Sequence, residues 1–136
     1  MAEEAGLITR QSRHPVSETL QRLEGALAAR GFMAFCRIDH SAAAAAVGET
    51  LLPRTVLIYG NPKIGTAAMT SFPTLAIDLP AKLLVWQDDA GRVWVTWNSG
   101  DYFFGTIFRR HSAAAAGTQI AAYDTLLAQV VAHALE

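Results

Sequence analysis

Apolar residues recur at helical spacing near both ends of the chain, and these two patterns predict the main helices. In the first, Val16, Leu20, Leu23 and Leu27 follow one another at intervals of four, three and four residues. In the second, the same type of spacing connects Ile120, Tyr123, Leu127, Val130 and Ala134. Each set lies along one face of a helix, so each predicted helix has an apolar side that must be covered by the rest of the protein.

The boundaries of the first helix are marked by residues with known preferences. Ser17 is a candidate N-cap, and Pro15 is the alternative start because proline is tolerated in a first turn. Gly31 occupies the position after the helix where glycine commonly ends it. The alanine-rich segment "HSAAAAAVG" predicts a second, short helix that ends at Gly48, and "KIGTAAMTS" is interpreted as a loop or a short helix.

Between these helices, the pattern predicts several strands. "GLITRQS", "FMAFCRID" and "RTVLIYG" have strand-like composition, and the last is apolar almost throughout, which favours a central position. "TLAIDLP" alternates between apolar and polar residues and is also predicted to be a strand. In "KLLVWQDDAGRVWVTWN" two apolar runs flank the turn signal "DDAG", which predicts a β-hairpin. Helices arranged around a sheet that contains a hairpin predict an α+β fold, in one domain of residues 1–136.

Composition and charge narrow the function classes. The chain has 51% hydrophobic and 17% charged residues and a formal net charge of −1, so it lacks the basic surplus that nucleic acid or an anionic membrane would attract. No apolar run approaches the ~20 residues of a membrane helix, and "MAEEAGLITRQS" does not resemble a secretory signal. We therefore expect a cytoplasmic protein with no nucleic-acid or membrane partner.

Metal sites and cofactors are not expected either. Cys36 is the single cysteine, and its position in a predicted strand favours a buried, inert thiol. The four histidines show no spacing typical of a metal site, and no cofactor-binding motif is complete.

The stretch "YGNPKIGT" is the most distinctive candidate for a site. Gly60 and Gly65 have the spacing of a phosphate-binding Walker A loop, but Thr66 stands where that motif requires lysine. Lys63 lies inside the loop, and Pro62 removes one of the N–H donors that would hold phosphate. The stretch is therefore not interpreted as a nucleotide-binding loop.

Two interpretations of this stretch remain open. It forms either a sharp turn after a strand, with Lys63 merely solvated, or a small polar, partly cationic ligand site. In the second case Asn61, Lys63, Gly65 and Thr66 would supply donors suited to an anionic or carbonyl-bearing ligand.

Three further residues have a structural and a functional interpretation. Asp39 and His40 precede the alanine helix, where Asp39 or Ser41 would serve as a cap; alternatively, Asp39 and His40 form an acid–base pair that faces the Lys63 loop. Asp78 is interpreted as a solvated strand residue or as a ligand contact.

Five blocks in one order resemble the bacterial and archaeal domain-of-unknown-function family three-hundred-two. These blocks are "RIDH", the following alanines, "VLIYGNPKIGT..M", "AIDLP.KLLVWQD" and "GRVWV". The resemblance continues weakly through "DYFFGTIFRRH", which is similar to a tail of the family that ends in Arg-His. The matched motif residues are Asp39, His40, Gly60, Asn61, Pro62, Lys63, Gly65, Thr66, Met69, Asp78, Leu79, Pro80 and Trp86. Where the family commonly has Phe this chain has Tyr59, and Ala81 replaces a bulkier apolar residue.

The resemblance implies a curved antiparallel sheet with helices packed on one face, of the TATA-binding-protein-like or helix-grip type. It also implies a homodimer, and it implies no activity. We interpret the chain as a small-ligand-binding domain with a site around the GNPK loop. One alternative is an enzyme that uses His40 as general base and Lys63 as electrostatic stabiliser, and another is a dimeric structural or interaction module.

Overall fold

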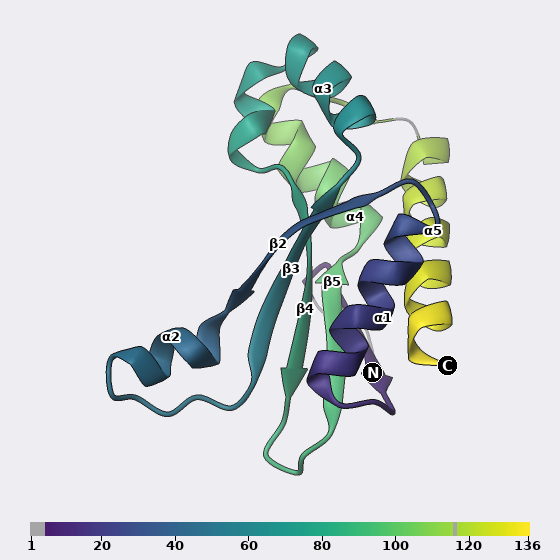
Figure 1. Ribbon diagram of the computed structural model, residues 1–136. Coiled ribbons are helices and arrows are strands. Elements are labelled where there is room, and N and C mark those ends of the chain that lie inside the picture. Colours follow the sequence, from purple (N-terminus) through teal and green to yellow (C-terminus); the bar gives the residue numbers. More distant parts are fainter. Residues whose placement is uncertain (1–4, 116) are drawn as a thin grey trace.

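The computed structural model describes residues 5–115 and 117–136 and shows one sheet of five antiparallel strands (Figure 1). The strands, in chain order, are β1 (Leu7–Ser12), β2 (Met33–Asp39), β3 (Arg54–Gly60), β4 (Ala81–Gln87) and β5 (Val93–Asn98). The larger helices are α1 (Val16–Ala28), α2 (His40–Ala46), α3 (Pro62–Ser71) and α5 (Gly117–Leu135). Shorter helical turns are η1 (Pro73–Ile77), α4 (Gly100–Tyr102), η2 (Phe103–Phe108) and η3 (Arg109–His111). The predicted α+β class is therefore confirmed.

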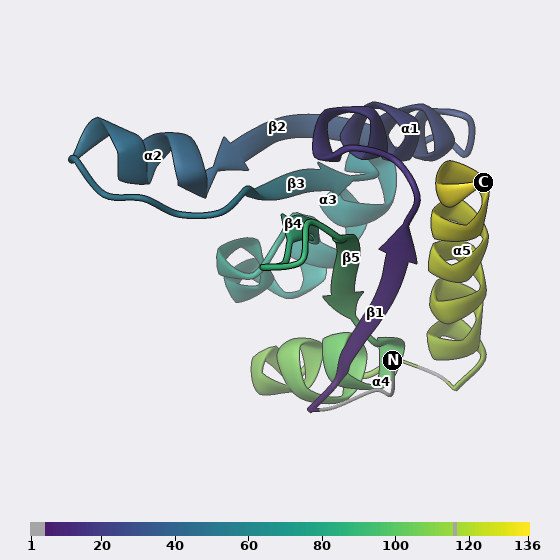
Figure 2. The same ribbon diagram turned by 90° about the horizontal axis from the view of Figure 1, so that it is seen from below.

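The sheet order is β1-β5-β4-β3-β2, so β1 and β2 lie at opposite edges. Because α1 connects these two edges, it crosses one face of the sheet, and α5 packs beside it on the same face (Figure 2). The predicted hairpin is present, with Leu83 opposite Trp97 and Gln87 opposite Val93. Gly91 adopts a positive φ of 82° in its turn, a conformation that glycine adopts without steric cost.

The core lies between this sheet face and the two helices. Alternate strand residues point into it, as the iBiBiBi burial of β3 shows for Thr55, Leu57 and Tyr59. From the helices, the predicted apolar faces supply Leu20, Leu23, Leu27, Leu127, Val130 and Ala134. The helical spacing therefore identified the buried sides of α1 and α5 correctly. Gly31, with a φ of 80°, follows α1 as predicted, whereas the N-cap position is occupied by Pro15 and not by Ser17.

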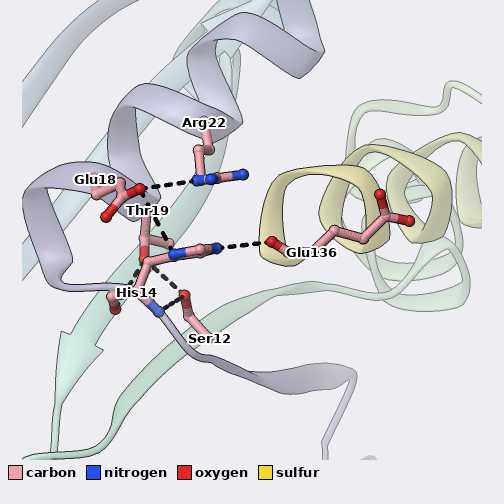
Figure 3. A network of polar contacts seen from close by, with 6 residues as sticks. All are labelled: Ser12, His14, Glu18, Thr19, Arg22 and Glu136. Carbon is pink, nitrogen blue, oxygen red and sulfur yellow. Dashed lines mark hydrogen bonds and ion pairs between the residues drawn. The ribbon is translucent and has the colours of Figure 1, made fainter.

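A polar network ties the start of α1 to the end of α5 (Figure 3). Nε2 of His14 contacts the backbone oxygen of Glu136 at 2.9 Å, and its Nδ1 lies 3.6 Å from Glu18. Beneath it, the buried hydroxyls of Ser12 and Thr19 are 2.7 Å apart. This network connects the turn between β1 and α1 to the C-terminal end of α5.

Two predictions are wrong. "TLAIDLP" is not a strand: it forms η1, in which Leu75 is buried and Ile77 is 78% exposed. Pro73, directly before this segment, suits the first turn of a helix and has no N–H to donate to a neighbouring strand. The alternation of apolar and polar residues therefore does not correspond to a strand here. Cys36 is exposed, because β2 is an edge strand in which every residue is exposed.

Candidate functional site

The GNPK stretch forms the first turn of α3, and Asn61 is its N-cap. The Asn61 side-chain oxygen accepts hydrogen bonds from the backbone N–H groups of Lys63 at 3.1 Å and Ile64 at 3.4 Å. The N–H of Gly65 donates to the Asn61 carbonyl at 2.8 Å, and Pro62 has no N–H. All the donors that usually make a helix N-terminus attractive to anions are thus already bonded within the turn.

The remaining predicted residues of this loop face solvent. Lys63 and Thr66 are exposed, and Lys63 takes part in no ion pair among the described residues. The Thr66 carbonyl accepts a hydrogen bond from the Thr70 hydroxyl within α3. Asn61 and Gly65 therefore have a structural role as cap and first turn, and neither described pocket is lined by Lys63 or Thr66.

Asp39 and His40 lie at the other end of the same strands. Asp39 caps α2, accepting from the Ala42 N–H at 3.0 Å and from the Ser41 hydroxyl at 2.6 Å. The Ser41 bond, followed by the Ala42 bond, lowers the pKa of the Asp39 carboxyl, which is fully exposed. Since Asp39 pairs with Thr55 while Met33 pairs with Gly60, the length of β3 separates this corner from the GNPK loop. That length is roughly 20 Å for a strand of this size, so within one chain the structure does not bring His40 and Lys63 together.

Asp78 does meet partners from a distant part of the chain. Its carboxylate accepts two hydrogen bonds from the Arg110 guanidinium, at 2.8 and 2.9 Å, and also contacts Nε2 of His111. The other ring nitrogen of His111 lies 2.8 Å from the Thr74 hydroxyl, so both nitrogens of this buried ring are engaged. The Arg110 bonds, and after them the His111 contact, hold the pKa of Asp78 below its usual range.

This cluster joins two motif blocks that the sequence presents more than thirty positions apart. Arg110 and His111 were not predicted as site residues. The only signal for them in the sequence was the weak resemblance of "DYFFGTIFRRH" to the Arg-His tail of the family. Asp78 itself, interpreted from the sequence as a strand residue, lies at the C-terminal end of η1.

A pocket of about 130 Å³ opens beside Asp78, where β4 begins and β5 ends. We call it the Asp78 pocket; its lining consists of Asp78, Pro80, Ala81, Lys82, Asn98, Phe103, Ile107 and Tyr123. Since a water molecule takes about 30 Å³, the space suits a small ion with a few waters or a ligand of a few heavy atoms. A broader hollow of about 410 Å³ lies between β1 and the end of α5, but it contains no motif residue.

Tyr123 lines the inner side of the pocket, and Tyr59 lies next to Tyr123 in the core. Burial raises the pKa of Tyr123 to about 12, so its hydroxyl stays protonated and can donate at neutral pH. It now reaches the Asn98 carbonyl at a long 3.4 Å. Burial, and after it the neighbouring Tyr123, also raise the pKa of Tyr59. The two hydroxyls interact, but their geometry is too poor for a well-formed hydrogen bond, so the Tyr59 hydroxyl is left without a good partner within the described structure. Tyr59 lies opposite Ala81 on the neighbouring strand, and Ala81 lines the pocket.

The described part of the chain contains no group of three or more His, Cys, Asp and Glu side chains arranged to hold a metal ion. Within the same residues, none of the helices combines the length and apolar character needed to cross a membrane.

Several known proteins resemble this chain in sequence. It is 38% identical over 109 residues to the "Fluoride-specific ion channel FluC 1" of Brucella suis biovar 1, and equally identical to the protein of that name from Brucella abortus biovar 1. The match covers 80% of this chain but only 41% and 39% of those proteins. The chain therefore spans about two fifths of the length of these relatives.

The fold also matches a solved structure. The crystal structure of an uncharacterized conserved DUF302 protein from Bacillus stearothermophilus superimposes with a TM-score of 0.79 and covers 96% of this chain and 99% of its own. At 19% identity, this similarity concerns the fold alone. The family model of DUF302, a domain of unknown function, matches residues 8–132, and on this match the chain belongs to the DUF302 family.

Proposed function

We propose that this domain binds a small anion in the Asp78 pocket. The observation that carries the proposal is the pocket itself, because two motif blocks that are distant in the sequence line it together. The first block contributes Asp78 and Pro80, and the second contributes Ile107. Lys82 and Tyr123 complete the polar part of the lining. This location replaces the GNPK loop as the centre of the predicted polar, partly cationic site.

The charges around the pocket favour an anion. Asp78 already has a bidentate partner in Arg110, so its negative charge is matched by a guanidinium. Lys82 lines the pocket and takes part in no ion pair among the described residues. Among Asp78, its partner Arg110 and Lys82, one positive charge is left over, which an anionic ligand would balance.

The donors that could contact an anion are also present. The Lys82 ammonium provides three N–H donors, the Asn98 amide two, and the Tyr123 hydroxyl one that remains protonated because of its raised pKa. The hydrogen bond from the Tyr123 hydroxyl to the Asn98 carbonyl is long and therefore weak, so little energy is lost when the hydroxyl donates to a ligand instead.

Fluoride is the first anion to test. The relatives in Brucella are named as fluoride-specific ion channels, and the matched region accounts for about 40% of their length. None of the described helices here is long and apolar enough to cross a membrane. We propose that the domain binds the anion on the cytoplasmic side, either as a separate protein that binds such a channel or as a domain of the same chain.

The experiment is a thermal-unfolding screen with fluoride, chloride, phosphate, sulfate and acetate at constant ionic strength. An anion present at 100 times its dissociation constant adds about 2.7 kcal/mol to the unfolding free energy. Lys82→Met removes the ammonium, and Ala81→Leu fills the pocket; both should abolish the stabilisation. Lys63→Met is the matched control, since it removes an exposed lysine outside the pocket and should leave the response unchanged.

Two outcomes would overturn this proposal. One is that no anion raises the melting temperature of the unmodified protein. The other is that the response persists in Lys82→Met and Ala81→Leu but disappears in Lys63→Met, which would return the site to the GNPK loop.

A second candidate function is self-association, and a specific observation favours it. Every residue of β2 is exposed, including the apolar Met33, Phe35 and Ile38, although β2 is a full member of the sheet. An exposed apolar edge strand invites pairing with another chain. We propose that the domain forms a homodimer, as the family resemblance implies. Light scattering should give twice the chain mass at tens of micromolar, and a monomer under those conditions would contradict it.

A further inference from the structure

We infer that the segment comprising β2, α2 and the five residues after α2 packs onto the uncovered sheet face of a second copy, and that the second copy does the same in return. We call residues 33–51 the arm and Val56, Ile58, Leu84, Trp86 and Trp94 the open face. The inference rests on the self-association proposed above and specifies which surfaces meet.

The arm contains a helix that its own chain supports only weakly. α2 has seven residues and none of them is buried. Isolated helices of fewer than about 12 residues are marginal in water, so tertiary packing normally stabilises them. α2 instead projects from the far edge of the sheet, away from α1 and α5 (Figures 1 and 2). Its alanines would allow close approach to a flat surface.

The open face is apolar and lies opposite the core. Side chains alternate along the strands, so Val56, Ile58 and Leu84 point away from α1 and α5 and remain only partly buried. Trp86 and Trp94 pair across β4 and β5 with ring centroids 6.2 Å apart. Their indole N–H groups are already bonded, to Thr96 and Asp88, which leaves the ring surfaces for apolar contact.

The exposed apolar residues are concentrated on the arm. Of the nine large hydrophobic residues that are exposed in the described structure, the arm holds five: Met33, Phe35, Ile38, Val47 and Leu51. These five residues are 39–75% exposed, so each leaves a large part of its side chain open to solvent. A stable interface buries about 800 Å² per partner, so the inference requires the arm and the open face to contribute to one contact.

The charges of the two surfaces are complementary. On the arm, neither Asp39 nor Glu49 takes part in an ion pair within the described structure. Arg54, opposite Trp86 in the sheet, donates only to backbone carbonyls and has no carboxylate partner there. A two-fold axis makes the contact reciprocal, because each copy offers one arm and one open face. In such a dimer, the arm of each copy would contact the open face of the other.

The first experiment tests the outward side of α2. Ser41 and Ala44 are partly buried against their own chain, whereas Ala43 faces outward. Ala43→Arg should convert the dimer to a monomer in light scattering while leaving far-UV circular dichroism unchanged. Ala128→Arg is the matched control, because Ala128 is an exposed alanine on α5, and this variant should remain a dimer.

The second experiment reports the contact directly. A nitroxide is attached to Ala45→Cys, an exposed position on α2 beside the contact and not at its centre, in a Cys36→Ser chain that also carries Trp86→Phe and Trp94→Phe. Mixed with unmodified protein, it should quench tryptophan emission of the unmodified chains in proportion to mixed dimer, and the same label at Ala128→Cys should not. A dimer that survives Ala43→Arg and shows no quenching would overturn the arm placement but leave self-association standing. A monomeric unmodified protein would overturn both.

Discussion

Replacing Tyr59 with phenylalanine should stabilise the protein, although Tyr59 is one of the most deeply buried residues. Its side chain is 2% exposed, and its hydroxyl has no hydrogen-bond partner among the described residues. The ring itself packs well, with an edge contact to Phe32 at a centroid distance of 6.1 Å. Tyr59→Phe keeps these ring contacts and removes only the unpartnered oxygen, and it restores the residue that the resembled family pattern has at this position.

The magnitude follows from two opposing effects. A buried polar group without a partner costs about 1–3 kcal/mol. Removing the oxygen leaves a void of roughly 15 Å³, which at ~24 cal/mol per Å³ costs about 0.4 kcal/mol. We therefore expect the free energy of unfolding to rise by about 1 kcal/mol, which corresponds to an increase in melting temperature of roughly 3–5 °C for a chain of this size.

The assay is urea unfolding followed by tryptophan fluorescence at fixed protein concentration, because self-association makes apparent stability depend on concentration. A higher midpoint with an unchanged m-value would show a true gain in stability. Tyr102→Phe is the control: Tyr102 is 37% exposed, so its change should stay within about 0.5 kcal/mol. If Tyr59→Phe instead lowers stability by 1 kcal/mol or more, the hydroxyl has a partner, such as the Tyr123 hydroxyl or a bound water or ligand, and the reasoning fails.

Three further predictions concern the cap, the pH dependence and the core. Asn61→Ala should lower the unfolding free energy by about 1 kcal/mol, because the Lys63 and Ile64 N–H groups lose their acceptor; Asn61→Asp, which retains the acceptor, should lose much less in the same urea assay. Stability should fall as pH rises from 10 towards 12, since the unfolded chain releases the Tyr123 proton near pH 10 and the folded chain only near 12. This shift contributes about 2–3 kcal/mol, and an alkaline titration of Tyr123→Phe that declines as steeply as the unmodified protein would contradict the assignment. Leu83→Ala, at a fully buried core position, should cost about 2–5 kcal/mol, and a loss below 1 kcal/mol in calorimetry would contradict the core assignment.

The sequence by itself determined those parts of the fold in which local pattern and burial agree. The spacing of Leu20, Leu23 and Leu27 identified the buried side of α1 because a helix face repeats every 3.6 residues, whatever covers it. The two apolar runs around "DDAG" identified the β4–β5 hairpin, because two strands joined by a short turn lie side by side and pair with each other. Gly31 marked the end of α1 because a positive φ favours glycine there.

Tertiary structure decided everything that depends on distant segments meeting. The alternation in "TLAIDLP" resembles a strand, but only the surroundings show that a single residue, Leu75, is buried in it. Strand register, which no local pattern encodes, placed Asp39 and Asn61 at opposite ends of β3 and so separated two motifs that the sequence suggested as one site. Conversely, the fold joined Asp78 to Arg110, thirty-two positions away, because the chain turns back across the same end of the sheet. Hydrophobic spacing reports which side of an element is buried, but which elements face one another is decided only when the whole chain packs.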